Sequence, residues 1–267
     1  MKTRTGFLAV LFTVLLAAGL AAAQVDMPYE VPHVPVAATT INQLDETFLV
    51  LWHLSPPEDW HLYSDRLNDS GFPPALTLQW PEGWSAGPLQ WPMGERHVMK
   101  GGILDHVYFE SVTLLQEIQV PPNSFADGDV TLSARWDWLV CRDICVPGFT
   151  QAEIVFSRSK PSHVDLEKQA KAWRALPHPV PEGRLEFAWT ESTVTLLVRD
   201  TELMEFHPAT DCIRLVDAIV DGAREGDTLT LRVRPGSDIS TSLRGVLQLT
   251  KPDGSFDNWT VDIPYGG

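Results

Sequence analysis

Two cysteines near the middle of the chain have the types and spacing for redox chemistry. Cys141 and Cys145 are separated only by Arg142-Asp143-Ile144. If those three residues connect the strands of a hairpin, the cysteines face each other with Cα atoms about 4.5–5.5 Å apart. A disulfide tolerates that separation. The spacing therefore predicts a Cys141–Cys145 bridge, which closes a very short loop and stabilises the fold little.

The residues before Cys141 indicate how the pair is presented. One face of the predicted strand carries the residues Val130, Leu132, Ala134, Trp136, Trp138 and Val140. The other face carries Thr131, Ser133, Arg135, Asp137 and Cys141. Because side chains alternate along a strand, the first face is predicted to be core. We expect Cys141 to point toward solvent or a covering loop, where a partner can reach its thiol.

A small stabilising role beside good access favours thiol–disulfide exchange, in which a thiolate attacks a disulfide through a mixed-disulfide intermediate. Arg142 would favour a thiolate and Asp143 would oppose it, so the attacking sulfur stays open. Three alternatives also stay open: a purely structural bridge, a metal site in which both thiolates join His97 or His106, and two reduced cysteines without function. A C-x₃-C spacing alone is a weak zinc signal. Cys212 is left over.

The segments that must position the pair are predicted to be mostly β-strands. Short runs rich in β-branched, aromatic and leucine residues are bounded by Pro, Gly, Asn or Asp. The first group is 47–54, 75–80, 111–120, 129–140 and 150–156. The second group is 184–189, 193–198, 212–220, 228–233 and 243–250. Between them, 164–176 shows helical spacing of Leu166, Ala170 and Trp173 behind a Ser162 cap.

This pattern predicts an all-β protein with two immunoglobulin-like β-sandwich domains, joined by a short helix and a Pro-rich linker. We expect a signal peptide at 1–23, the domain with the cysteine pair at 24–160, the helical linker at 161–181 and the second domain at 182–267.

The beginning of the chain and its charge point to an exported protein. Lys2 and Arg4 precede an apolar run from Phe7 to Leu20, and Ala21-Ala22-Ala23 offers a cleavage site. This is the layout of a secretory signal peptide. The formal net charge of −15 argues against nucleic-acid binding and against polybasic membrane binding. We therefore expect a soluble protein that does not span a membrane.

Several motifs in one order resemble a known family. Trp138-Leu-Val-Cys141-Arg-Asp-Ile-Cys145-Val-Pro147 resembles the cysteine motif of the N-terminal periplasmic domain of DsbD-type thiol:disulfide interchange proteins. It is most similar to the branch called suppressor of copper sensitivity protein B. The upstream motifs are Trp60-His-Leu-Tyr63, Asp69-Ser-Gly-Phe-Pro-Pro74, Pro81-Glu-Gly-Trp84, Gly87-Pro-Leu-Gln-Trp-Pro92 and Glu95-Arg96. The resemblance is good from Trp52 to Phe156 and loose afterwards.

The resemblance implies a periplasmic immunoglobulin-like domain whose paired cysteines receive reducing equivalents from a membrane domain and pass them to thioredoxin-fold proteins. It also implies an aromatic cap loop over the pair, for which Tyr108 and Phe109 are the candidates. The family's membrane domain and thioredoxin-like domain are absent from this sequence. A separate membrane electron-transfer protein is therefore expected as the donor.

The sequence thus predicts a periplasmic thiol–disulfide exchange protein of the protein-disulfide reductase type. Cys141 and Cys145 are its redox pair, Trp138, Arg142, Asp143 and Pro147 lie near them, and no further cofactor or metal is expected. The alternative is a secreted β-sandwich binding module with a structural disulfide. A copper-binding role for such a module, linked to copper tolerance, would draw on His53, His61, His97, His106, Met93 and Met99.

Overall fold

The computed structural model describes residues 32–44, 46–234, 236 and 241–266, and these residues form eighteen strands and two helices. The protein is therefore all-β, as the sequence predicts. The expected signal peptide at 1–23 lies outside the described residues. Within the described part of the chain, no helix has the length and apolar composition needed to cross a bilayer.

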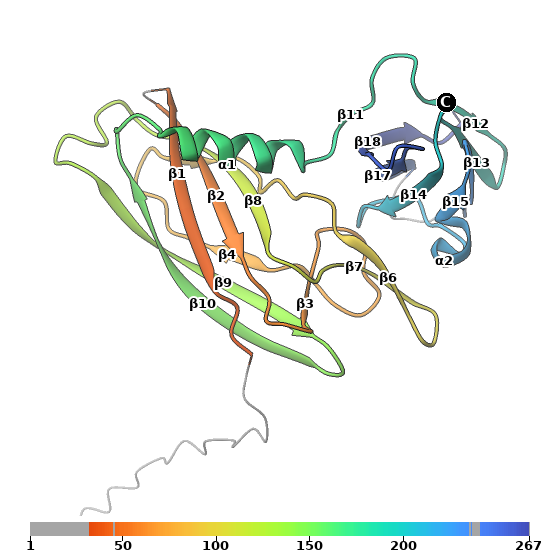
Figure 1. The fold of residues 1–267 in the computed structure, drawn as a ribbon, viewed down its shortest axis with the longest axis horizontal. Helices are drawn as coiled ribbons and strands as arrows, with labels where there is room; N and C mark the ends of the chain where they lie inside the picture. The colour runs from red at the N-terminus through yellow and green to blue at the C-terminus, as the bar shows by residue number, and fades with distance from the viewer. Residues whose placement is uncertain (1–31, 45, 235, 237–240, 267) are drawn as a thin grey trace, which may run out of the picture. The chain divides into compact units, whose positions relative to one another are not determined.

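Two antiparallel sheets of the first half enclose the larger core (Figure 1). One sheet has the order β1 (Val36–Leu44), β2 (Thr47–Leu54), β8 (Val112–Gln119) and β5 (Ser85–Ala86). The other has the order β10 (Cys145–Phe156), β9 (Val130–Cys141), β3 (His61–Tyr63), β7 (Ile103–Tyr108) and β6 (Glu95–Met99), and β4 (Ala75–Thr77) also pairs with β9. Side chains from both sheets meet between them: the rings of Trp52 and Trp136 have centroids 5.4 Å apart.

A second pair of sheets forms from the second half of the chain and has its own core. The larger sheet has the order β11 (His178–Pro179), β18 (Phe256–Pro264), β17 (Ser242–Thr250), β14 (Leu203–Pro208) and β15 (Ala223–Glu225). The smaller has the order β12 (Glu186–Trp189), β13 (Thr193–Leu197) and β16 (Thr228–Arg232). The expected strand at 212–220 is wrong. This segment instead contains the one-turn helix α2 (Ala218–Asp221), whose Asp217 side chain accepts a hydrogen bond from the Val220 amide.

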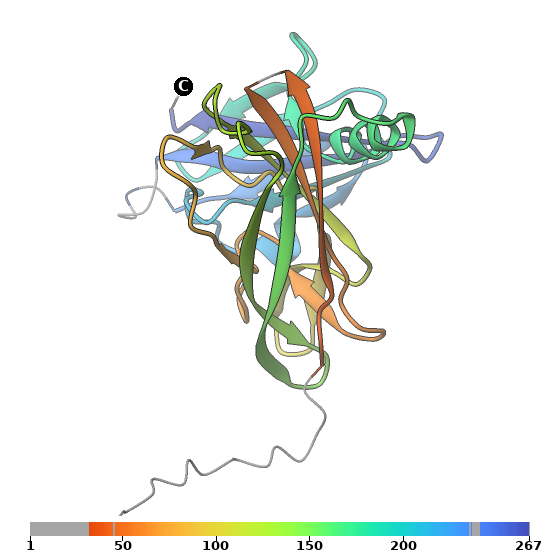
Figure 2. The same cartoon turned by 90° about the vertical axis from the view of Figure 1, so that its left-hand side faces the viewer.

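Helix α1 (His163–Arg174) begins at Ser162, as the sequence predicts. Ser162 and Asp165 cap each other's backbone amides in a capping box. Leu166 and Trp173, whose spacing predicts the helix, are exposed. The helix instead buries Ala172, which packs with Leu176 on the outer side of the β1–β2–β8 sheet. Both Figure 1 and Figure 2 show α1 at the end of the β9–β10 hairpin that lies opposite its turn.

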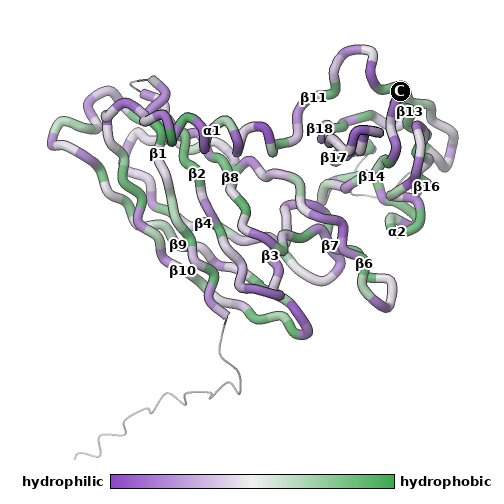
Figure 3. The backbone as a smooth tube through the Cα atoms, in the orientation of Figure 1, coloured by the Kyte–Doolittle hydropathy of each residue, from purple (hydrophilic) through white to green (hydrophobic). Residues whose placement is uncertain are grey.

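The β9–β10 hairpin is the element that carries the cysteine pair. Its twelve-residue strands pair without a break from Val130 opposite Phe156 to Cys141 opposite Cys145. More and less buried residues alternate along most of both strands, and Figure 3 shows both hydrophobic and hydrophilic stretches in them. One face buries Trp136, Trp138 and Val140 in the core, which confirms the predicted core face of this strand. The ladder fixes the cysteines at the neck of the turn.

Candidate functional site

The two cysteines form a disulfide at the tip of the β9–β10 hairpin. Cys141 ends β9, Cys145 begins β10, and their Cα atoms lie 4.1 Å apart. The Arg142 amide donates to the Ile144 carbonyl oxygen at 3.1 Å and closes the turn between them. The hairpin arrangement predicted from the spacing is therefore present.

The two cysteine residues differ in their exposure to solvent. Cys141 is only 3% exposed, whereas Cys145 is an exposed residue. Tyr63 from β3 and Val107 from β7 form a second, small apolar cluster with Leu139 and Cys141. The expectation that a partner reaches Cys141 is thus wrong, because this cluster covers the face of β9 that alternation assigns to polar residues. The exposed member of the pair is Cys145.

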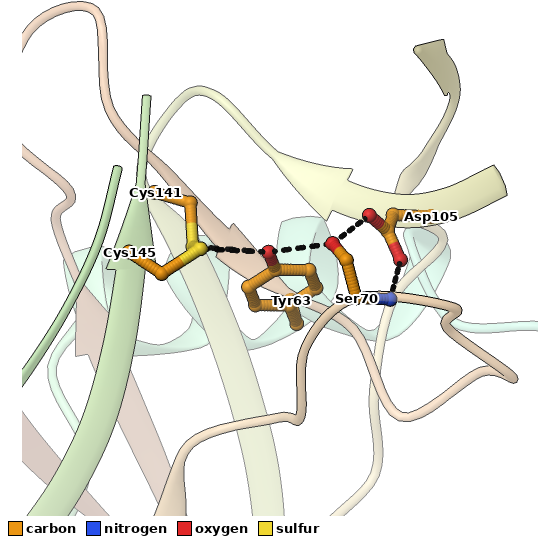
Figure 4. Close-up of a disulfide and its surroundings, with 5 residues drawn as sticks. All are labelled: Tyr63, Ser70, Asp105, Cys141 and Cys145. Atoms are coloured by element: carbon orange, nitrogen blue, oxygen red, sulfur yellow. Dashed lines mark hydrogen bonds between the residues drawn. A yellow bond between two sulfur atoms is a disulfide. The ribbon is translucent and has the colours of Figure 1, made fainter. Parts of the chain in front are cut away.

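A chain of three polar side chains leads from the bridge into the protein (Figure 4). The Tyr63 hydroxyl lies 3.0 Å from Cys141 Sγ and 3.6 Å from Cys145 Sγ. The same hydroxyl lies 3.2 Å from Ser70 Oγ. Ser70 in turn donates to the fully buried Asp105 carboxylate, from its amide at 3.0 Å and from its hydroxyl at 2.5 Å. Residues from three separate segments therefore form one hydrogen-bonded chain that ends at the disulfide.

Burial sets the protonation of the groups beside the bridge. Desolvation raises the pKa of Tyr63, and the nearby Asp105 charge adds to the rise although the Ser70 hydrogen bond lowers it. Tyr63 therefore keeps its proton at neutral pH and can donate it. Desolvation also lowers the pKa of His61, and so does the neighbouring His97. His61 is therefore a neutral ring at neutral pH.

Aromatic rings line the approach to the pair. His61 lies opposite Cys141 in the β3–β9 ladder, and its ring centroid is 5.4 Å from those of Tyr63 and Phe109. The Phe109 ring also contacts the His97 ring, at 5.2 Å. Phe109 is 37% exposed, so its ring is shared between the His61 contact and solvent.

The sequence-predicted residues near the pair divide into core and surface. Trp138 is buried, and its indole N–H lies 3.4 Å from Thr150 Oγ1. Tyr108 is buried in the main core, where its hydroxyl donates to the Pro92 carbonyl oxygen at 2.7 Å.

Three other predicted residues lie at the surface around the turn. The Arg142 guanidinium lies 5.1 Å from the Trp60 ring centroid and 3.3 Å from the Asp143 carboxylate. Pro147 is exposed opposite Leu139 in the ladder. The turn thus offers partners a cation, an anion and the half-exposed Ile144 side chain.

Residues suggested for a metal site do not converge. Among the residues that the structure describes, no three His, Cys, Asp or Glu side chains form a cluster able to hold a metal ion. His97 lies next to His61, with ring centroids 5.7 Å apart, whereas His106 packs against His207.

Tyr63, Ser70 and Asp105 are the site residues that sequence reasoning missed. Tyr63 and Ser70 lie within two of the family-like motifs, but no spacing rule connects them to the cysteines. Asp105 lies shortly before the cap candidates Tyr108 and Phe109, and its sequence context is that of an ordinary strand residue. Only the pairing of β3 with both β7 and β9 brings the three together.

Comparisons with known proteins agree with this geometry. Residues 31–157 match the family model described as "Thiol:disulfide interchange protein DsbD, N-terminal". No curated protein matches the chain.

Among solved structures, the N-terminal periplasmic domain of ScsB from Proteus mirabilis is 18% identical. The match covers 90% of this chain and 96% of that one, with a TM-score of 0.57. The two proteins therefore share a fold that extends beyond the matched family region. The major pilin subunit BcpA of Bacillus cereus is 10% identical over 88% of this chain and 67% of its own, and its TM-score of 0.25 is too low to carry an argument.

Proposed function

Residues 31–157 belong to the family of DsbD N-terminal domains, and from this membership we propose that the chain carries reducing equivalents between proteins through Cys141 and Cys145. Family membership assigns thiol:disulfide interchange as the chemistry. The observation that supports the assignment here is a disulfide between one buried and one exposed cysteine at the tip of a hairpin.

The unequal exposure favours one order of events. An incoming thiolate attacks Cys145 Sγ, a new S–S bond forms to Cys145, and the electron pair of the broken bond leaves on Cys141. The second thiolate of the partner then attacks the partner sulfur that is bonded to Cys145, and Cys145 leaves as a thiolate. The pair gains two electrons and the partner becomes a disulfide. Delivery to a client is the same sequence in reverse, and it begins with Cys145 as the nucleophile.

The partners and the direction of electron flow are proposed by analogy with the family. We propose that a membrane electron-transfer protein reduces the pair, and that thioredoxin-fold proteins of the periplasm accept the electrons. The signal peptide expected at 1–23 would deliver the chain to that compartment.

A cap over the pair is a further part of this proposal. Phe109 is the better candidate of the two cap residues, because its ring already lies against His61 beside Cys141. Tyr108 is anchored in the core by its bond to the Pro92 carbonyl oxygen, so it would hold the cap strand in place. Docking of a partner would move the Phe109 ring aside.

The first test is the reduction potential of the pair. Purified protein with Cys212→Ser is equilibrated against glutathione or a thioredoxin, and the fraction oxidised is measured. We expect a reversible potential between roughly −270 and −120 mV, the span of known exchange proteins. A potential below about −300 mV would instead identify a structural bridge.

The second test distinguishes the two sulfurs. Two variants each keep one cysteine of the pair: Cys141→Ser/Cys212→Ser and Cys145→Ser/Cys212→Ser. Each is mixed with a single-cysteine thioredoxin whose thiol is activated as a mixed disulfide with a small leaving group. We expect Cys145 to form the protein–protein disulfide much faster than Cys141, because only Cys145 is exposed. Equal trapping rates would contradict the proposed order.

A further inference from the structure

The hydroxyl of Tyr63 has one proton and three acceptors within reach. Cys141 Sγ lies at 3.0 Å, Ser70 Oγ at 3.2 Å and Cys145 Sγ at 3.6 Å. The proton of Ser70 itself is directed to Asp105, because a carboxylate offers only acceptor atoms. Ser70 Oγ therefore presents lone pairs to Tyr63, and the phenolic proton is shared between an oxygen and the sulfurs of the bridge.

The oxidation state of the bridge decides this competition. A neutral disulfide sulfur is a weak acceptor, so the hydroxyl oxygen of Ser70 is the stronger partner while the bridge is closed. A thiolate sulfur carries a full charge, and hydrogen bonds to charged acceptors are about twice as strong as neutral ones. Formation of a thiolate on Cys141 therefore draws the proton from Ser70 to the sulfur.

The position of Tyr63 is fixed on several sides. Its strand, β3, pairs with both β7 and β9. Gly71 packs directly on its ring, so closely that an added Cβ would lie 2.1 Å from the ring carbon Cζ. Ser70 is itself held by its two bonds to the buried Asp105. The phenol therefore stays at the bridge without the entropy loss of an ordering step.

We propose that Tyr63 contacts the reacting sulfur as the hydrogen-bond donor that stabilises the Cys141 thiolate. Ser70, held by Asp105, is a positioning residue that competes with the sulfur for this proton while the bridge is oxidised. The proposal rests on the proposed function, since it explains why Cys141 is the leaving group. The raised pKa of Tyr63 keeps the donor proton in place while the thiol ionises.

The thiol pKa of Cys141 tests the proposal directly. In a Cys145→Ala/Cys212→Ser background, Cys141 is the sole thiol, and its ionisation is followed by the NMR shift of a ¹³Cβ label across pH. Tyr63→Phe keeps the ring and removes the donor, so we expect the pKa of Cys141 to rise by about 1–2 units. Ser70→Ala removes the competing acceptor, and we expect the pKa to fall by about 0.5–1 unit.

A control variant and a kinetic measurement separate this effect from loss of structure. Tyr265→Phe removes a phenolic hydroxyl that donates to the Glu191 carbonyl oxygen in the second half, and it should leave the pKa of Cys141 unchanged. Reduction of the full Cys141–Cys145 bridge by dithiothreitol should be slower in Tyr63→Phe, because a leaving thiolate with a higher pKa departs more slowly.

An unchanged pKa of Cys141 in Tyr63→Phe would overturn the donor role, and a raised pKa in Ser70→Ala would overturn the competing-acceptor role. Neither measurement uses a protein partner. Failure of exchange with thioredoxin-fold proteins would therefore be seen separately from failure of this hydrogen bond.

Discussion

Cys212 shows what burial does to a thiol outside the bridge. It is a free, buried cysteine, and desolvation raises its pKa to about 11 although the Arg244 backbone amide partly opposes the rise. The thiolate is the nucleophile in every exchange reaction. Cys212 is therefore a poor candidate for resolving intermediates or for joining two copies of the chain.

We predict that Cys212 resists modification in the native protein. With the bridge oxidised, iodoacetamide at pH 8 should leave the chain unlabelled, and one label should appear after unfolding in guanidinium. Mass spectrometry of the intact protein gives both numbers. Rapid native labelling, lost in Cys212→Ser, would show that this thiol is open to solvent.

The sequence predicts the cysteine pair well and its surroundings poorly. A bridge across a three-residue turn depends only on local spacing, so it can be read directly from Cys141 and Cys145. Burial of Cys141 and the contacts of Tyr63, Ser70 and Asp105 depend on strands that are distant in the sequence. Alternation indicates which face of β9 a side chain occupies, but it cannot show that Tyr63 and Val107 cover that face.

At the scale of elements, the β9–β10 hairpin depends on close packing between its strands. Gly148 lies opposite Trp138, and an added Cβ would sit 2.2 Å from a carbon of the indole ring. Because Gly148 has no side chain, it leaves room for the Trp138 ring in the core.

We predict that Gly148→Ala destabilises the protein by about 1–3 kcal/mol, the usual effect of overpacking a core position. Urea unfolding followed by tryptophan fluorescence measures the loss. Gly87→Ala is the matched control, because its Cβ would meet its nearest neighbour at 3.5 Å, an ordinary contact. Equal stability of the two variants would show that Trp138 can move without cost.

Element prediction succeeded where local pattern and tertiary pairing agree. β2 is found at its predicted bounds, and β8, β13 and β16 are each within a residue at either end. β18 was missed because Asp257-Asn258 reads as a turn, although Trp259, Val261 and Ile263 alternate into the second core. In α1, whose existence and cap the sequence predicts, Leu166 and Trp173 stay exposed, and the sheet contacts Ala172 and Leu176 instead.

At the scale of the whole molecule, two histidines from the two halves of the chain are buried against each other. The ring centroids of His106 and His207 lie 4.9 Å apart, and both residues are fully buried. Desolvation lowers the pKa of His106 to about 4, with smaller opposing effects from its bond to the Leu67 carbonyl and from Asp105, and with Arg96 and Arg66 adding to the drop. Desolvation, His106 and the same two arginines lower the pKa of His207 as well.

This pair predicts a loss of stability in mild acid. Between pH 6.5 and 4, these two histidines bind protons in the unfolded chain but stay neutral in the folded chain. The free energy of unfolding therefore falls as the pH falls through this range. His106 alone would contribute on the order of 3 kcal/mol. Urea unfolding at several pH values should therefore show a flatter pH dependence in His106→Gln than in the natural protein. His33→Gln, at an exposed position, should keep the natural slope.

The ladder between β9 and β10 has a consequence for how this protein can be tuned. Because the bridge closes so short a loop inside strands that are already fully paired, opening it releases little chain entropy. The balance between the oxidised and reduced forms is therefore set by the few side chains around the sulfurs, and hardly by the rest of the fold. Natural variation or protein engineering could thus adjust the redox balance at positions such as Tyr63 and Ser70 while both cores remain untouched.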